Sequence, residues 1–152
     1  MSSGTTIVLC TVLLLVATVS AVELSTSFVE VNLGCLKPGL TYSVLQERNL
    51  PVSVTNMGKS PVELRISVVP PRQEELREGY EPVLAAGWVK LEQERFQVQR
   101  GGTAITDARV SVPGDEQFRG RHFQVWPWSQ TMSDTGIGAG LKSRLLFSVC
   151  EE

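Results

Sequence analysis

Residues 50–68 read Leu-Pro-Val-Ser-Val-Thr-Asn-Met-Gly-Lys-Ser-Pro-Val-Glu-Leu-Arg-Ile-Ser-Val, and this stretch decides the fold. Before and after its centre, apolar side chains alternate with polar ones. A period of two is typical of strands with one buried face. The Asn-Met-Gly-Lys sequence at 56–59 favours a turn, and Pro70-Pro71 ends the second strand because proline cannot donate to a ladder. The stretch therefore predicts two half-buried antiparallel strands joined by a turn.

Similar alternation recurs along the rest of the chain. Residues 88–98 suggest a strand, a turn and a short second strand, and residues 105–112 place Asp107 and Arg109 on an outward face. With the remaining candidates, this makes about seven or eight short strands, which predict an all-β, immunoglobulin-like antiparallel β-sandwich. The remaining candidate strands are residues 28–33, 41–45, 120–128 and 141–150.

Two segments do not follow this pattern. Residues 72–78, directly after the two prolines, are expected to form one or two helical turns or a surface loop, because proline and acidic residues favour the first turn of a helix. The glycine-rich residues 136–140 precede a strand rather than a helix, so they do not match a phosphate-binding loop. We expect a hairpin connection or the bulged start of a strand there.

The N-terminus predicts export. Residues 7–19 form an uncharged apolar run, shorter than the roughly 20 residues that span a membrane. The run matches the core of a secretory signal peptide, with Val-Ser-Ala at 19–21 as the cleavage sequence. We predict a signal peptide over 1–21 and a single domain over 22–152, secreted or periplasmic, with no membrane span after cleavage. No Lys or Arg precedes the run, so an uncleaved anchor or a buried N-terminal strand stays open.

Export would leave Cys35 and Cys150 as the cysteines of the mature domain. An oxidising compartment favours a disulfide between them, and such a bridge requires the first and last strands to be neighbours. A pair of free thiols is the alternative, because nothing in the sequence sets the distance between the two residues.

Composition excludes some functions. The chain has 152 residues, with 14 Lys and Arg against 16 Asp and Glu, and a formal net charge of −2. Electrostatic binding of nucleic acid requires a basic excess, so no nucleic-acid partner is expected. The balance of apolar and charged residues is that of an ordinary folded domain rather than a disordered chain.

Residues that carry catalysis are scarce in this sequence. His122 is the single histidine, whereas a zinc site needs three or four ligands and a serine triad needs a suitable nucleophile beside the histidine. The paired carboxylates lie in turn-like or solvated contexts: Glu74 and Glu75, Glu92 and Glu94, and Asp115 and Glu116. We therefore predict no catalytic residues, no metal and no cofactor.

The stretch Phe-Gln-Val-Trp-Pro-Trp at residues 123–128 is the best candidate for a binding surface. If Phe123 and Val125 face the core, the opposite face carries the side chains of His122, Gln124, Trp126 and Trp128. Two outward indoles would suit sugar stacking or protein binding. The nearby cations Arg119, Arg121, Lys142 and Arg144 could line the same surface. In the alternative, Pro127 breaks the alternation and one or both indoles cover a sheet end.

These segments carry a family resemblance over residues 28–150. The 50–58 sequence followed by an alternating strand is similar to the opening of many prokaryotic immunoglobulin-like modules. The Trp88 strand, Gly101-Gly102, the strand before Pro113 and the Gly120 strand look like their second half. Pilus-chaperone-like domains and glycosidase-associated modules share this layout. Pilus chaperones have two such domains with a basic cleft between them, however, and this chain has room for one.

Two functions follow from the resemblance and the residues. The first is an exported, non-catalytic binding or structural module of the cell envelope that contacts a protein or glycan partner through loops or a sheet surface. The alternative is a periplasmic chaperone-like assembly factor that uses β-strand augmentation. A long unpaired edge strand without protective charges would favour the alternative.

Overall fold

The computed structural model describes residues 23–133 and 136–152 of the chain. Almost all regular structure in these residues is extended strand. The strands are β1 (Leu24–Ser25), β2 (Glu30–Leu36), β3 (Thr41–Ser43), β4 (Val52–Asn56), β5 (Val62–Val69), β6 (Glu81–Pro82), β7 (Val89–Leu91), β8 (Arg95–Val98), β9 (Thr103–Thr106), β10 (Ala108–Ser111), β11 (His122–Ser133), β12 (Gly136–Lys142) and β13 (Arg144–Val149).

Helical segments are short. One α-helix, α1 (Val44–Arg48), begins where the Ser43 side chain accepts the Gln46 N–H. Three single turns of 3₁₀ helix connect strands: Gln73–Glu75, Ala86–Trp88 and Glu116–Phe118. No helix in the described part of the chain is long and apolar enough to cross a membrane.

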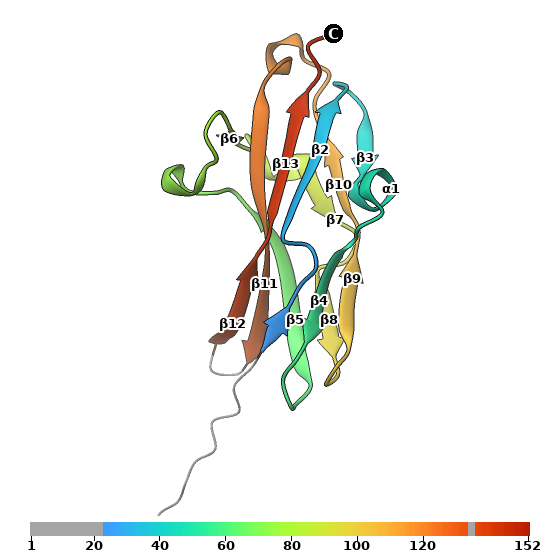
Figure 1. Cartoon of the computed structure of the whole chain (residues 1–152), viewed down its shortest axis with the longest axis vertical. Helices are drawn as coiled ribbons and strands as arrows, with labels where there is room; N and C mark the ends of the chain where they lie inside the picture. The colour runs from blue at the N-terminus through green and yellow to red at the C-terminus, as the bar shows by residue number, and fades with distance from the viewer. Residues whose placement is uncertain (1–22, 134–135) are drawn as a thin grey trace, which may run out of the picture.

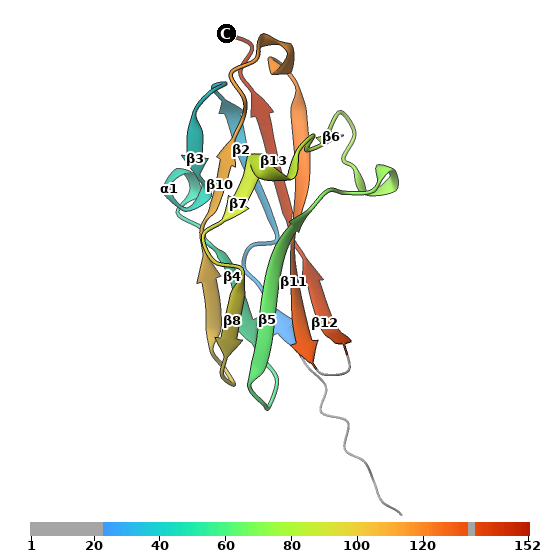
Figure 2. The same cartoon turned by 180° about the vertical axis from the view of Figure 1, so that it is seen from behind.

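The larger sheet has the strand order β2-β13-β11-β5-β8. Beside this path, β12 pairs antiparallel with the second half of β11, and β6 pairs parallel with its first half. The second layer consists of two three-stranded sheets, β3-β10-β7 and β1-β4-β9. In the view of Figure 1 the first is the upper one and the second the lower one. Figures 1 and 2 show the resulting elongated sandwich from its two sides.

The N-terminal strand crosses between the layers. β1 pairs antiparallel with β4 in one layer, and β2 pairs parallel with β13 in the other. The predicted all-β, immunoglobulin-like sandwich is confirmed. Residues 50–68 fold as expected, with β4 and β5 joined by a turn in which the buried Asn56 side chain accepts the Gly58 N–H at 3.0 Å.

The expectation of one strand over residues 105–112 is wrong. The segment bends at Asp107, so that β9 pairs with β4 while β10 pairs with β3 and β7. Asp107 is buried rather than outward, and it accepts the Ser43 hydroxyl at 2.5 Å and the Leu45 N–H at 3.0 Å. The same contacts end the expected 41–45 strand at Ser43, because they hold the start of α1.

One other strand differs from the expectation, and two segments follow it. The expected strand over residues 141–150 is divided at Ser143, whose N–H donates to the Pro127 carbonyl at 2.9 Å between β12 and β13. The glycine-rich residues form a strand, β12, whose register shifts against β11, which matches the expected bulged start. Residues 72–78 contain a single 3₁₀ turn.

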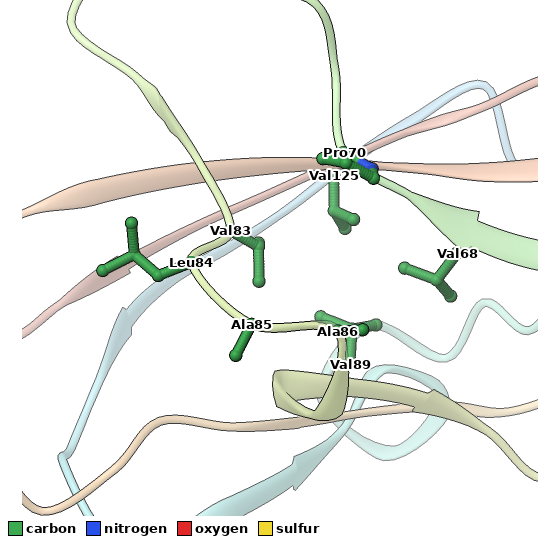
Figure 3. A pocket seen from close by; sticks show the side chains of 8 residues that line it. All are labelled: Val68, Pro70, Val83, Leu84, Ala85, Ala86, Val89 and Val125. Carbon is green, nitrogen blue, oxygen red and sulfur yellow. The ribbon is translucent and has the colours of Figure 1, made fainter.

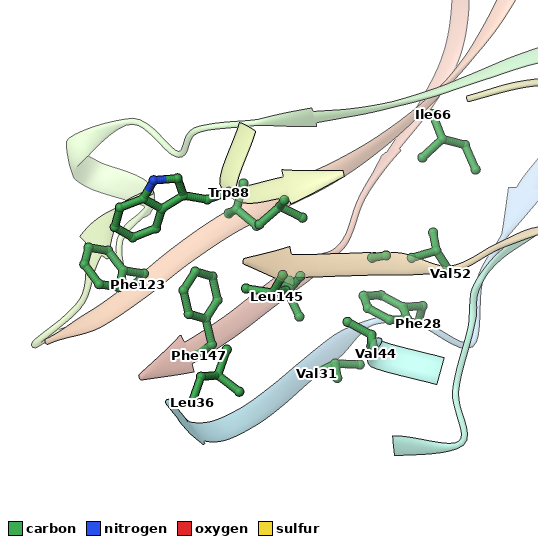
Figure 4. Close-up of a cluster of buried hydrophobic side chains, with 14 of the residues drawn as sticks. Phe28, Val31, Leu36, Val44, Val52, Ile66, Trp88, Phe123, Leu145 and Phe147 are labelled. Atoms are coloured by element: carbon green, nitrogen blue, oxygen red, sulfur yellow. The ribbon is translucent and has the colours of Figure 1, made fainter. Parts of the chain in front are cut away.

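The core fills the space between the layers. At one end, Trp88 makes edge-to-face contacts with Phe118 and Phe123, at centroid distances of 4.9 and 5.0 Å. At the other end, aliphatic residues such as Val44 and Val52 lie around Phe28 (Figure 4). Aromatic pairs of this geometry add roughly 0.5–1.5 kcal/mol beyond area burial.

The disulfide between Cys35 and Cys150 is confirmed. The residues are 115 positions apart in sequence, and their Cα atoms lie 4.8 Å apart. The parallel pairing of β2 with β13 brings them together, because Ser148 lies opposite Cys35 and the Cys150 N–H donates to the Leu36 carbonyl at 2.8 Å. The predicted signal peptide over 1–21 lies outside the described residues.

Reduction of this disulfide is expected to destabilise the fold strongly. A closed loop of 115 residues is worth about 4–5 kcal/mol in the chain-entropy model. Urea unfolding should therefore show that the Cys35→Ser/Cys150→Ser protein loses about that free energy, as should the reduced wild type. An unchanged unfolding midpoint after reduction would contradict the expectation.

Candidate functional site

Two indoles and two cations form one surface on the outer face of the larger sheet, which we call the aromatic–cation surface: Trp126, Trp128, Lys142 and Arg144. The Lys142 ammonium lies 5.0 Å from the Trp128 ring centre and 5.9 Å from that of Trp126. The Arg144 guanidinium lies 5.0 Å from the Trp126 ring centre. Such contacts contribute from about 0.5 to 2 kcal/mol each, depending on how far the pair is desolvated.

Strand pairing sets this arrangement. Trp128 lies directly opposite Lys142 in the β11–β12 pair and opposite Ser67 in the β11–β5 pair. Pro127 is buried on the inner face, and Trp126 and Trp128 are half-buried on the outer face. Pro127 thus leaves the alternation intact, which removes the alternative that it breaks the strand. Whether the two indoles bind a partner stays a prediction.

Glycine in β12 makes room for the indole of Trp128. A Cβ at Gly140 would lie 3.0 Å from the Trp128 indole nitrogen, and one at Gly138 would lie 2.7 Å from the Thr131 hydroxyl. Side chains at these positions would displace their neighbours. The glycine-rich sequence therefore has a packing role.

The expectation that Gln124 faces solvent is wrong. Gln124 is fully buried beneath residues 72–82, a segment that we call the strap. Its side-chain oxygen accepts the Arg77 N–H and its amide nitrogen donates to the Glu75 carbonyl, both at 2.9 Å. Figure 1 shows the strap projecting from the sandwich beside β11. Gln124 therefore anchors the strap and is not accessible to a partner.

His122 remains exposed, as expected, and packs edge-on against Tyr80 of the strap at 5.3 Å between ring centres. Two of the cations expected near the indoles lie elsewhere. Arg121 pairs with Glu81 at 2.6 Å, which lowers the pKa of that carboxyl, and Arg119 pairs with Glu116 at 2.7 Å. The surface therefore keeps only Lys142 and Arg144 of the four cations.

Ion pairs fasten the strap to the aromatic–cation surface. Glu75 lies 3.1 Å from Lys142 and 3.1 Å from Arg72. Glu30 on β2 pairs with Arg77 of the strap at 2.8 Å and with Arg144 at 3.0 Å. The Arg72 N–H and then the Lys142 ammonium hold the pKa of Glu75 at about 2, below its ordinary value of 4.5.

The carboxylate pairs considered for catalysis serve other contacts. Glu74 and Glu75 both pair with Arg72, and Glu92 pairs with Arg109 at 2.5 Å. Asp115 accepts the Gln117 N–H at 3.0 Å. Within residues 23–133 and 136–152, no three His, Cys, Asp or Glu side chains are grouped in a way that could hold a metal ion.

Sequence reasoning missed an apolar cavity of about 170 Å³ between the end of β5 and the segment that leads into β7. Figure 3 shows Val68 and Val125 facing the segment of residues 83–86 across this space. The exposed Leu84 lies at its edge. The sequence pattern indicates that Val68 and Val125 are buried, but not that they line a cavity. That cavity exists because the fold brings both valines close to residues 83–86, which are distant from them in sequence.

The depressed pKa of Glu75 makes the stability of the strap depend on pH. A carboxyl whose pKa is lower in the folded than in the unfolded state stabilises the fold above its unfolded pKa, and this contribution is lost as pH falls toward the folded pKa. Between pH 4.5 and about 2, wild type should therefore lose more stability than Glu75→Gln. Thermal unfolding at pH 6 and pH 3 tests this, with the exposed Glu78→Gln as control. Equal losses in wild type and Glu75→Gln would show that the ion pairs contribute nothing.

No protein-family model and no curated protein sequence matches the chain. Among solved structures, the PapD-like domain 7 of human CEP192 has a TM-score of 0.59 at 12% identity and covers 100% of this chain and 99% of its own. A protein of Bacteroides ovatus that has been proposed to bind carbohydrate also has a TM-score of 0.59 at 12% identity. The periplasmic chaperone SfaE has 0.53 at 12%.

The last two matches each cover 84% of this chain, but only 37% and 58% of the respective matched chains. Identities this low show the fold alone. The chain therefore has the PapD-like, immunoglobulin-like β-sandwich fold that its sequence resembles.

Proposed function

We propose that this protein is an exported, non-catalytic binding module of the cell envelope that contacts its partner through the aromatic–cation surface. The observation that carries the proposal is the ordering of Trp126, Trp128, Lys142 and Arg144 before any partner is bound. Binding usually requires the ordering of long side chains, at roughly 0.5–1.5 kcal/mol each. In this surface, stacking on the indoles and ion pairs with Glu75 and Glu30 already hold the Lys142 and Arg144 side chains in place, so little further ordering is needed on binding.

The chemistry of the surface favours a protein partner over a glycan. Trp and Arg are the residues that most often dominate protein interfaces. A sugar would stack on the open face of an indole, but Lys142 lies over both rings and Arg144 also lies over that of Trp126. The cation heads and the exposed parts of the two rings are then the groups that a partner meets, whereas the indole nitrogen of Trp126 is buried.

The disulfide supports the predicted export. Bridges of this kind form and persist in oxidising compartments, and Cys35–Cys150 is built into the pairing of the first and last long strands. A secreted or periplasmic location follows as part of the proposal, together with cleavage of residues 1–21.

Replacement of both Trp126 and Trp128 by alanine is expected to abolish partner binding while costing only about 1–3 kcal/mol of stability, because the rings are half-buried and stacked on cations. The same change at the buried Trp88 should cost about 3–5 kcal/mol. Urea unfolding measures both.

Binding is measured by recovering envelope proteins on the immobilised protein and quantifying them by mass spectrometry. Wild type and Ile105→Ala, an exposed apolar position on β9 in the other layer, should recover the same partner. The Trp126→Ala/Trp128→Ala and Lys142→Glu proteins should lose it. Recovery of one unchanged set by all four proteins would contradict the proposal.

One observation favours the second candidate function, chaperone-like assembly by β-strand augmentation. In the described part of the chain, β12 is a seven-residue strand paired with β11 alone, and its sequence carries no charge before Lys142. Two other edges differ from it: β8 has four residues, and on β2 the Arg48 guanidinium donates to the Asn32 carbonyl.

Augmentation at β12 would protect backbone amides that point away from β11. The Ser143 N–H points toward β11, and antiparallel pairing alternates, so the Gly140 N–H points outward. Hydrogen exchange at Gly140 should slow on addition of the partner if β12 is the contact strand. Unchanged exchange there, with binding intact, would exclude this second function.

A further inference from the structure

The upper end of β5 has a free edge. β8 pairs with β5 only along Val62–Arg65, and the last bond across this edge is from the Ile66 N–H to the Glu94 carbonyl, at 2.8 Å. In an antiparallel ladder, backbone groups point to the same side at every second residue. The N–H and C=O of Val68 therefore point the same way as the Ile66 N–H, past the end of β8. Nothing in the described part of the chain pairs with them there.

The neighbouring strand of the other layer also has a free edge. β7 is the last strand of the order β3-β10-β7. The Glu92 N–H donates to the Asp107 carbonyl at 3.0 Å, so by the same alternation the backbone groups of Val89 and Leu91 point away from β10. The two free edges face one open side of the sandwich, which we call the β5–β7 seam.

The 170 Å³ cavity lies in this seam. Its walls are Val68 and Pro70 on one side and residues 83–86 with Val89 on the other, and Val125 lies at the back (Figure 3). All of these side chains are aliphatic. A cavity of about 150 Å³ with such walls accepts a ligand the size of benzene, so this one has room for a single branched aliphatic side chain.

A second hollow continues the seam toward β8. It shares Val68, Ala86 and Val89 with the cavity and adds the charged residues Arg65, Lys90 and Glu94. Neither cation has an ion-pair partner among residues 23–133 and 136–152, in contrast to those of the aromatic–cation surface. One end of the seam is therefore aliphatic, and the other carries two unpaired cations against one carboxylate.

We propose that the β5–β7 seam binds an extended segment of a partner protein that adds to the free edge of β5. One aliphatic side chain of the segment enters the cavity beside Val68, and a carboxylate reaches Arg65 and Lys90. Val68 and Arg65 are three residues apart and on opposite faces of β5. Arg65 already lies opposite Arg95 of β8, so the segment ends level with Ser67. Its acidic residue therefore directly follows the aliphatic one, lies on the outer face, and reaches Arg65 along the diagonal.

Backbone geometry selects a peptide over a small apolar ligand. An apolar molecule would fill the cavity but leave the backbone groups of Val68 and Val89 and both cations unmatched. An extended peptide supplies backbone hydrogen bonds for affinity and alternate side chains for specificity. The site lies on the inner side of β11, at Val125, so it is distinct from the aromatic–cation surface and goes beyond the function proposed above.

The test uses a synthetic heptapeptide, acetyl-Thr-Val-Thr-Val-Leu-Glu-Thr-amide, in which Glu directly follows Leu. Two control peptides carry Asn in place of Leu or Lys in place of Glu. Titration into the purified protein, followed by amide NMR, should shift the signals of Val68 and its neighbours with the first peptide. Each control peptide should bind about tenfold more weakly, which is a typical loss for an aliphatic anchor or a close charge pair.

Protein variants identify the site independently. Ala86→Phe, at an exposed position that faces both hollows, should reduce binding about tenfold by filling the seam. Arg65→Glu should weaken the Glu peptide and strengthen the Lys peptide. The matched Arg100→Glu, at an exposed turn position without an ion pair, should leave both unchanged.

Several results would overturn the proposal. These are absent shifts at millimolar peptide, equal binding of all three peptides, or equal effects of Arg65→Glu and Arg100→Glu. Concentration-dependent dimers that Ala86→Phe abolishes, without peptide binding, would show that a second copy fills the seam and would also overturn it. The Trp126→Ala/Trp128→Ala protein should bind the peptide normally, so failure at either surface leaves the other proposal standing.

Discussion

Strand β11 is hydrogen-bonded on both sides along most of its twelve residues, and it changes neighbour on each side part-way. It pairs with β13 and then β12 on one edge, and with β6 and then β5 on the other. Its inner residues, such as Phe123 and Val125, build the core and the back of the cavity. Its outer residues hold the strap through Gln124 and form the aromatic–cation surface. A break in this one strand would disturb both candidate surfaces together.

The second layer is built differently, from strands that cross. The segment from β7 to β8 leaves the β10 side and joins β5, and the segment from β9 to β10 bends at the buried Asp107. At its upper end β5 still pairs with β11, but the crossing of β7 into β8 leaves its other edge there unpaired among the described residues. The seam is thus a direct consequence of topology. A buried polar group needs hydrogen-bond partners. The bend at Asp107 is held because the buried carboxylate accepts the Ser43 hydroxyl and the Leu45 N–H at the start of α1.

Sequence alternation identified strands wherever a single face was buried, as in Val52–Asn56 and Val62–Val69. It failed where a polar side chain was buried for a partner distant in sequence. Asp107 bonds to Ser43, and Gln124 bonds to the strap, so both appear outward by pattern while lying inside. The disulfide could be suggested but not decided, since it depends on the parallel pairing of β2 with β13. No sequence pattern indicated the β5–β7 seam, because a gap between two strand edges depends on how the strands are arranged and not on the residues of either strand.

A free strand edge is a hazard in a sandwich, because it can pair with the same edge of another copy. In this protein the exposed stretch of β5 is kept short. Pro70 and Pro71 follow Val69 directly and cannot donate to a ladder, while Glu94 and β8 close the other end. Arg65 and Lys90 place like charges at the opening, which would oppose two identical edges that approach each other. These features disfavour self-pairing but leave room for a short acidic segment, which is the occupant that the cavity and the cations would accept.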